Sequence, residues 1–104
     1  FETGLKEIGP YAFQYCTKLE EVSFPTSVKK IGAGAFAGCE ELEKVVIGRG
    51  VTEIGGNAFA YCKTLYEIEY QGTVNEWQNI SLEIAWNFLV PALYVVCTDG
   101  IVNI

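Results

Sequence analysis

Residues 31–50, IGAGAFAGCEELEKVVIGRG, decide the fold, because their pattern occurs three times along the chain. Each copy contains Ile-Gly, then Ala-Phe, a cysteine three residues after the phenylalanine, and a strand-like apolar segment, at a constant shift of 23 residues. The equivalent positions are Ile8, Gly9, Ala12, Phe13, Cys16, Leu19, Val22 and Phe24; Ile31, Gly32, Ala35, Phe36, Cys39, Leu42, Val45 and Ile47; and Ile54, Gly55, Ala58, Phe59, Cys62, Leu65, Ile68 and Tyr70. Such a repeat predicts a solenoid, in which each unit buries its apolar side against its neighbours.

Each unit is expected to contain a short strand and a return segment. The spacing of Leu42, Val45 and Ile47 is typical of a strand whose alternate residues face one way. Phe36 and Cys39 fall on one side of a single helical turn, which is about all that the return can hold. Successive strands are therefore expected to be parallel neighbours about 4.8 Å apart, with equivalent side chains in columns.

The composition supports a buried core and excludes several classes of function. The 104 residues are 50% apolar and only 19% charged, so a disordered chain is excluded. The net charge of −6 disfavours nucleic acid and anionic membranes as partners. The absence of histidine removes imidazole catalysis and His-containing zinc sites, so no catalytic residue, metal or cofactor is expected. No apolar run of about 18 residues is present to span a membrane.

The repeat frame predicts a division of the chain into residues 1–72, with three repeats, and residues 73–104, with a degenerate repeat and a capping hairpin. Phe1 falls on the register of Phe24, so the first strand is truncated, and we expect the chain to be a segment of a longer protein or a processed product. At the other end the 23-residue frame places Trp77 in the position of Ile54.

The segment after the third repeat is predicted to seal the stack, because terminal repeats of solenoids are atypical. We expect a short helix at 74–80 and an irregular apolar cover up to residue 92. Residues 93–104 predict a hairpin around a turn that contains Asp99-Gly100.

The unit L-x-x-I-G-x-x-A-F-x-x-C-x-x-L-x-x-V-x-F-P-x-x-V resembles the BspA-like leucine-rich repeat, also called the Treponema-type or type 5 class. The proline after the strand is present once, as Pro25, and Gly48 and Gln71 replace it in the later copies. The resemblance implies an α/β fold: a leucine-rich-repeat solenoid of 23-residue repeats with short parallel strands, one-turn helical returns and a C-terminal cap.

The same resemblance implies an extracellular or cell-surface bacterial protein of adhesin type, with a host matrix or microbial surface protein as a possible partner. Our first hypothesis is therefore a non-enzymatic protein-interaction module. The alternative is a passive structural spacer of a surface protein with no ligand of its own. Uniform charged columns on the exposed face favour the spacer, and varied columns with apolar residues favour binding.

Two columns of equivalent side chains are predicted to form a structural ladder inside the coils: Cys16, Cys39 and Cys62, and Phe13, Phe36 and Phe59. The cysteines are expected to be buried free thiols, because the side chains of a ladder point in parallel and cysteine packs as a small hydrophobe. Cys97 is out of register and is expected to be a lone thiol in the terminal hairpin.

The opposite, concave face of the strands is the predicted binding surface. Its residues are Glu21, Lys44 and Glu67 in one column, Ser23, Val46 and Glu69 in the next, and Tyr66 beside them. The structural interpretation of the Glu-Lys-Glu column is cross-strand charge pairing, which would stabilise the sheet by about a few tenths of a kcal/mol. The functional interpretation is an acidic patch with one apolar spot that docks a basic or mixed surface.

Three other clusters have a structural and a functional interpretation. Glu20 and Glu43 have the spacing of a glycosidase pair, but nothing in an open sheet would raise one pKa or exclude water. Trp77, Trp86, Phe88 and Tyr94 either plug the open end or form a carbohydrate platform. Tyr15 and Tyr61 are expected to pack at the solvent edge, and Asn79-Ile80-Ser81 matches a glycosylation acceptor.

Overall fold

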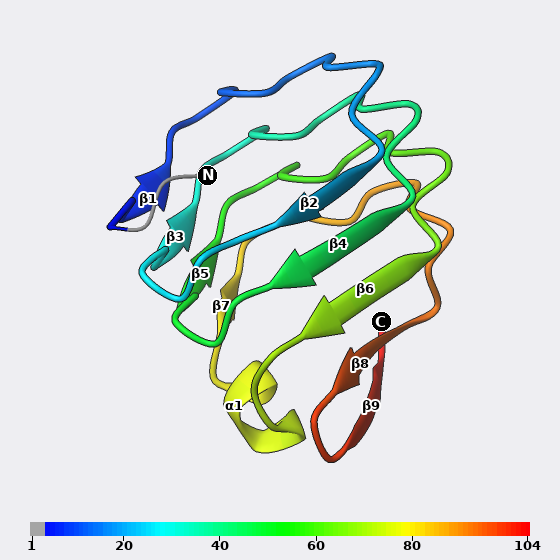
Figure 1. Cartoon of the computed structure of the whole chain (residues 1–104). Helices are drawn as coiled ribbons and strands as arrows, with labels where there is room; N and C mark the ends of the chain where they lie inside the picture. The colour runs from blue at the N-terminus through cyan, green and yellow to red at the C-terminus, as the bar shows by residue number, and fades with distance from the viewer. Residues whose placement is uncertain (1–3) are drawn as a thin grey trace.

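The computed structural model describes residues 4–104 as four stacked coils, each of which contributes one strand to each of two sheets (Figure 1). The first sheet contains, in order, β1 (Glu7–Ile8), β3 (Lys30–Ile31), β5 (Glu53–Ile54) and β7 (Ser81–Leu82). The second contains β2 (Glu21–Ser23), β4 (Lys44–Ile47), β6 (Glu67–Tyr70), β8 (Tyr94–Cys97) and β9 (Gly100–Asn103). The predicted solenoid is confirmed. The register proposed for Phe1 lies outside the described residues.

The stacking register is 23 residues between the first three coils and longer into the fourth. Ile8 pairs with Ile31 and Ile31 with Ile54, but Ile54 then pairs with Leu82, 28 residues later. The prediction that Trp77 takes the place of Ile54 is therefore wrong. The reason is α1 (Val74–Gln78), a five-residue helix that leaves the coil between β6 and β7 and displaces the frame.

The segment after α1 is a regular part of the solenoid and not the irregular apolar cover that the sequence predicted. Residues 81–92 form the return of a fourth coil, because Phe59 and Tyr61 donate backbone hydrogen bonds to Trp86 and Phe88 at 2.9 Å each. The predicted hairpin is confirmed, with β8 and β9 antiparallel and Cys97 opposite Gly100. The division of the chain into three repeats at 1–72 and a degenerate repeat with a capping hairpin at 73–104 stays a prediction.

The returns are runs of turns and not single helical turns. Every coil has two residues with positive φ, four positions apart: Tyr11 and Tyr15, Gly34 and Gly38, Asn57 and Tyr61, Ala85 and Leu89. Between them, alternate N–H groups point along the solenoid axis, so Phe13 donates to Ala35 at 2.7 Å and Phe36 to Ala58 at 2.8 Å. A helical turn directs its N–H groups to its own carbonyls. The return segments adopt turns instead of a helical turn because the turns leave N–H groups free to bond to carbonyls of the next coil.

A glycine follows each of the first three strands of the first sheet, β1, β3 and β5, and in the second and third coils it lets the backbones approach closely. A Cβ on Gly32 would lie 2.7 Å from the carbonyl carbon of Gly9, and a Cβ on Gly55 would overlap the Ala33 backbone nitrogen. By contrast, a Cβ on Gly9, in the first coil, would meet no atom of residues 4–104 within 4 Å. The repeated Ile-Gly pair is therefore a packing requirement in the second and third coils, whereas the fourth coil carries Leu82-Glu83 at the same positions.

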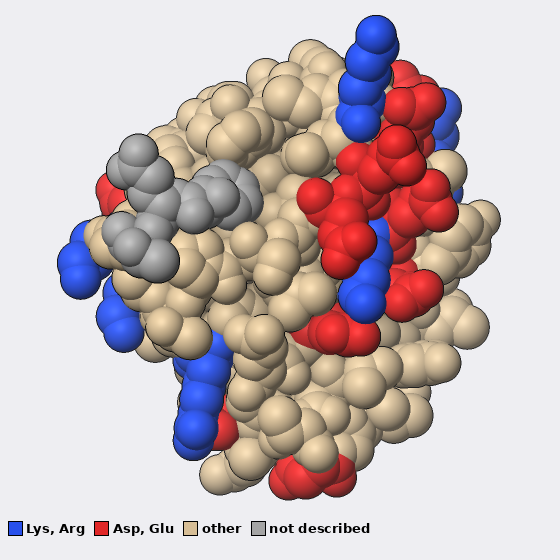
Figure 2. Space-filling view, in the orientation of Figure 1, with Lys and Arg blue, Asp and Glu red and all other residues tan. Residues whose placement is uncertain are grey.

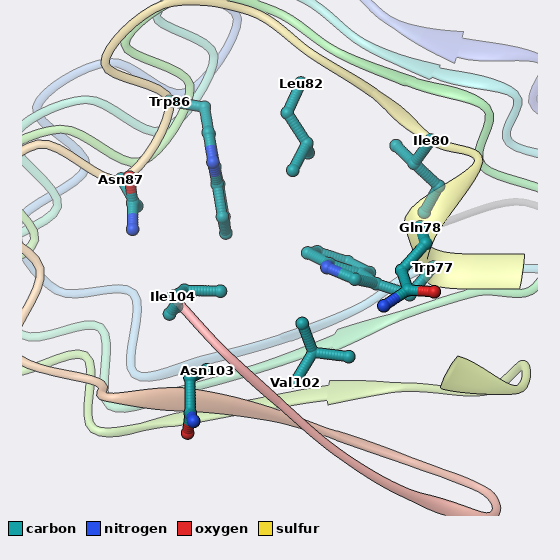
Figure 3. Close-up of a pocket in the computed structure, with 9 residues that line it drawn as sticks. All are labelled: Trp77, Gln78, Ile80, Leu82, Trp86, Asn87, Val102, Asn103 and Ile104. Carbon is teal, nitrogen blue, oxygen red and sulfur yellow. The ribbon is translucent and has the colours of Figure 1, made fainter. Parts of the chain in front are cut away.

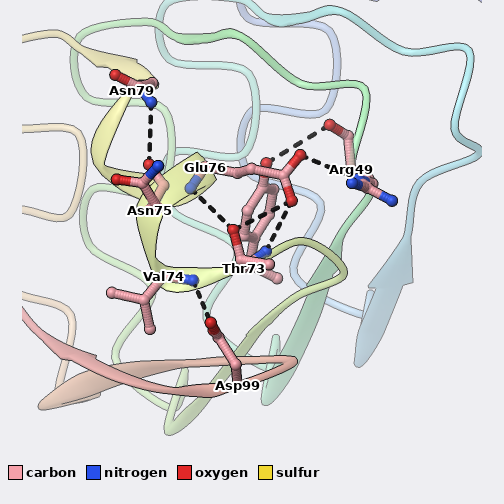
Figure 4. Close-up of polar contacts among 8 residues, drawn as sticks. Arg49, Thr73, Val74, Asn75, Glu76, Asn79 and Asp99 are labelled. Atoms are coloured by element: carbon pink, nitrogen blue, oxygen red, sulfur yellow. Dashed lines mark hydrogen bonds and ion pairs between the residues drawn. The ribbon is translucent and has the colours of Figure 1, made fainter.

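A network of hydrogen bonds holds α1 against the solenoid and the hairpin (Figure 4). Thr73 Oγ1 accepts the Glu76 N–H at 3.1 Å, and Glu76 Oε1 accepts the Thr73 N–H at 3.0 Å, which completes a capping box. Arg49 Nε donates to Glu76 Oε2 at 3.0 Å, and Asp99 Oδ1 in the hairpin turn accepts the Val74 N–H at 2.8 Å. The Thr73 N–H, followed by Arg49, holds the pKa of Glu76 below its usual range.

Candidate functional site

The exposed face of the second sheet carries the residues predicted for binding. The register brings Lys44 between Glu21 and Glu67, and Val46 between Ser23 and Glu69, as the two predicted columns require. That these residues bind a partner stays a prediction. Glu21, Ser23 and Glu67 are exposed, Lys44 and Glu69 are half-buried, and Tyr66 is 67% exposed.

The charge pairing on this face runs diagonally and not along one column. Lys44 Nζ lies 3.3 Å from Glu69 Oε1, and this hydrogen bond raises the pKa of the Lys44 ammonium. Val46 stands two residues after Lys44 and directly opposite Glu69, and it is only 9% exposed. The predicted apolar spot at Val46 is therefore largely covered.

The exposed apolar surface lies one strand further along the sheet. Tyr66, Tyr94 and Val96 surround a hollow of about 210 Å³ together with Glu67 and Glu69. Tyr94 and Val96 are 46% and 42% exposed. These two residues come from β8, which pairs Val96 with Glu69. Sequence reasoning missed Val96 and assigned Tyr94 to the end plug, because the 23-residue frame had lost the fourth coil.

An acidic band borders this sheet. Figure 2 shows Asp and Glu side chains gathered on one side of the molecule, over the starts of β2, β4 and β6. The exposed carboxylates there belong to Glu20, Glu21, Glu40, Glu41, Glu43 and Glu67. Lysines interrupt the band, and Lys63 pairs with Glu40 at 2.7 Å. The sheet thus joins an apolar hollow to a negatively charged edge.

Comparison with protein families agrees with this geometry. Residues 1–85 match the family model described as BspA type leucine rich repeat region (6 copies). The chain belongs to this family. No curated protein and no solved structure matches it significantly. The BspA-type leucine-rich-repeat family indicates a repeat protein used for protein interaction, and it is commonly surface-associated in bacteria.

The BspA-type repeats build the predicted ladder of aromatic rings and thiols. Phe36 is fully buried and stacks between Phe13 and Phe59, with ring centroids 5.2 and 5.4 Å apart and planes 5° from parallel. Each of the later thiols donates to a carbonyl of the preceding coil: Cys39 Sγ to Phe13 and Cys62 Sγ to Phe36, both at 3.2 Å. The columns therefore join the coils by packing and by hydrogen bonds.

The cysteines of this BspA-type chain are all free thiols. Cys39, Cys62 and Cys97 are buried and Cys16 is half-buried. The neighbouring Cys39 thiol and burial raise the pKa of Cys62, and burial raises that of Cys97. The raised pKa and the burial make the Cys62 and Cys97 thiols poor nucleophiles. Across residues 4–104, no group of three or more Cys, Asp and Glu side chains is placed to hold a metal ion.

The aromatic cluster of the last coil divides into two parts. Trp77 and Trp86 are 2% and 7% exposed and pack edge to face at 5.8 Å, so they do plug the end. The same prediction is wrong for Phe88 and Tyr94, each 46% exposed. The register is the reason: Tyr94 starts β8, and the Phe88 ring lies on the outside against Tyr61 at 5.5 Å.

The remaining candidates all lie at the surface of the described chain. Tyr15 and Tyr61 are 69% and 52% exposed. Glu20 and Glu43 stand on adjacent coils, joined by a 2.8 Å backbone hydrogen bond, and both are open to water. Asn79 Nδ2 donates to the Asn75 carbonyl at 3.1 Å. None of the helical structure in residues 4–104 has the length and apolar character that a bilayer span requires.

Proposed function

We propose that this chain is a non-enzymatic, extracellular or cell-surface protein-interaction module of an adhesin-like protein. The hollow between Tyr66, Tyr94 and Val96 carries the proposal. It offers exposed aromatic and aliphatic side chains on a hydrogen-bonded parallel sheet, next to carboxylates that select the partner's charge. Aromatic anchors within a polar rim are typical of the residues that dominate binding energy at protein interfaces.

The chemistry of the surface defines the partner. Glu67 and Glu69 line the hollow, and the acidic band continues from it along the strand starts. A partner with a protruding apolar side chain flanked by Lys or Arg would place its cations against these carboxylates. The proposed class is a basic or mixed surface on a host matrix protein or a microbial surface protein.

The test is surface plasmon resonance of the whole chain over immobilised matrix proteins, with variants that separate the two faces. Tyr66→Ser removes the central ring of the hollow. Tyr15→Ser is the matched control, because Tyr15 is 69% exposed and Tyr66 is 67% exposed, but Tyr15 lies in a return segment. Loss of an interface aromatic typically costs about 2 kcal/mol, so we expect about thirtyfold weaker binding for Tyr66→Ser.

The outcome decides between the two functions considered. Binding that Tyr66→Ser weakens and Tyr15→Ser leaves unchanged supports the module. Equal loss in both variants, or binding that rises as added salt screens the carboxylates, contradicts it.

The alternative function, a passive spacer, is favoured by the ion pairs that join neighbouring coils, Lys30 with Glu53 at 3.3 Å and Lys63 with Glu40 at 2.7 Å. A chain with no affinity for any of the immobilised proteins would support this alternative.

A further inference from the structure

The last return segment presents a row of backbone donors. In the third coil, the N–H groups of Asn57, Phe59 and Tyr61 donate to carbonyls of the fourth coil at 3.3, 2.9 and 2.9 Å. The residues that hold these positions in the fourth coil are Ala85, Asn87 and Leu89, and Ala85 and Leu89 repeat the positive φ of Asn57 and Tyr61. Within residues 4–104 their N–H groups meet no acceptor.

The hairpin covers only half of this end of the solenoid. β9 pairs with β8 and so closes the described edge of the second sheet. β7, at the edge of the first sheet, has β5 on one side and no strand on the other among the described residues. Leu82 in β7 is 38% exposed, whereas Ile31 and Ile54 in the same column are fully buried. The fourth coil therefore leaves the edge strand β7 and the return segment after it open to an added chain segment.

A cavity of about 390 Å³ opens at the same end. Figure 3 shows Trp77, Trp86, Leu82 and Ile104 turned toward one another around it. Its rim includes Asn87, which occupies in the fourth coil the position held by Phe59 in the third. An apolar side chain from one further coil would therefore fall beside or into this cavity.

We propose that this open end binds an extended polypeptide segment of a partner protein, laid across it as one more coil. Three carbonyls, one at every second residue of the segment, accept the N–H groups of Ala85, Asn87 and Leu89. One aromatic or large aliphatic side chain of the segment fills the cavity beside Trp77 and Trp86. This surface lies at the end of the stack and is independent of the sheet face proposed above.

A polypeptide fits this end because the coil-to-coil contact inside the molecule supplies the pattern. The carbonyls of Ala33, Ala35 and Ala37 accept the N–H groups of Tyr11, Phe13 and Tyr15 at 2.7 to 2.9 Å. The fourth coil keeps the backbone conformation that makes this contact and offers the donor side of it. Main-chain hydrogen bonds combined with a side-chain pocket are the usual way in which an extended peptide adds to an exposed edge.

Tryptophan fluorescence reports this site directly, because both tryptophans of the chain line the cavity. The probe is the acetylated, amidated peptide Ala-Gly-Ala-Phe-Ala-Gly, which copies residues 33–38 and contains no tryptophan. We expect a saturable change in tryptophan emission on titration. The matched peptide with Ala in place of Phe should bind about tenfold or more weakly, because it leaves the cavity empty.

Two variants locate the binding. Ile104→Ser removes an apolar wall of the cavity at a side chain that is 37% exposed and keeps the backbone hydrogen bond to Leu93, and it should weaken binding of the Phe-containing peptide severalfold. Tyr66→Ser, on the sheet face, should leave the titration unchanged. The proposal is overturned if no saturable change occurs up to about 1 mM peptide, if both peptides bind equally, or if Ile104→Ser has no effect. Reversible dimers that the peptide dissociates in sedimentation experiments would make a second copy the occupant and also contradict it.

Discussion

Replacing Phe36 by alanine should be among the most destabilising changes in the chain. Phe36 is fully buried, stacks on a ring at 5.2 Å on one side and at 5.4 Å on the other, and meets Phe24 edge to face at 5.6 Å. No side chain of the neighbouring coils can collapse into the space, because each is held in its own column. The substitution therefore leaves a cavity in the centre of the stack.

The expected loss can be estimated from the structure. Phe to Ala in a protein core costs about 3–5 kcal/mol, and the loss of two stacked ring contacts places Phe36 in the upper part of that range. A domain of this size has a total stability of about 5–15 kcal/mol. With a urea m-value of about 2 kcal/mol/M, a loss of about 4–5 kcal/mol should lower the unfolding midpoint by about 2–2.5 M.

Urea unfolding followed by far-UV circular dichroism measures this shift. Tyr66→Ala is the control, since its ring is 67% exposed, and it should change the free energy of unfolding by less than about 0.5 kcal/mol. A loss below about 1 kcal/mol for Phe36→Ala would refute the stacked column, because no fully buried phenylalanine is removed so cheaply.

Three further predictions test other parts of the structure. In the native protein a thiol reagent should spare Cys39, Cys62 and Cys97, whereas all four cysteines should react in denaturant; fast native labelling of three thiols, followed by mass spectrometry, would contradict the ladder. Gly55→Ala should lower the free energy of unfolding by about 1–3 kcal/mol through backbone overlap. Gly9→Ala should not, because its Cβ would meet no atom of the described residues within 4 Å, and equal losses in denaturation would count against the close approach of coils. The pKa of Glu76 is lower in the folded protein than in the unfolded chain, where it is about 4.3, so ionised Glu76 stabilises the fold above that pH. This stability is lost as the pH falls through the folded pKa, and Glu76→Gln should therefore flatten the decline of the thermal midpoint in acid. An unchanged pH profile of the midpoint would disprove this contribution.

The columns of the first three coils could be predicted from the sequence, because identical spacing leaves one register. Ile8, Ile31 and Ile54 are paired as their 23-residue shift requires. The exposed columns through Lys44 and Val46 follow from the same shift and the alternation of strand residues. These parts of the fold depend on local pattern alone.

The fourth coil could not be placed in this way, because α1 adds five residues without disturbing the hydrophobic pattern of its flanks. Thr73 and Glu76 carry the spacing of a capping box, and this was the available signal for a helix that leaves the coil. When the five residues of the helix are left out of the count, the 23-residue frame places Leu82 in the column after Ile54. The hollow beside Tyr94 and Val96 was missed for the same reason.

The turns of the return could not be predicted from most of the copies. Tyr11, Tyr15 and Tyr61 adopt positive φ, which few residues other than glycine favour. The second copy carries the clue, since Gly34 and Gly38 hold the same positions. Bonds between coils compensate for the strained conformations, and a single repeat examined in isolation does not contain those bonds.

The register of the fourth coil fixes both the sheet-face hollow and the open end, and nuclear Overhauser effects between backbone protons test it most directly. In isotope-labelled protein we expect cross-strand contacts between Ile54 and Leu82 and between Glu69 and Val96. Backbone contacts that pair Ile54 with Trp77, as a continued 23-residue frame requires, would contradict the four-coil solenoid and with it both proposed surfaces.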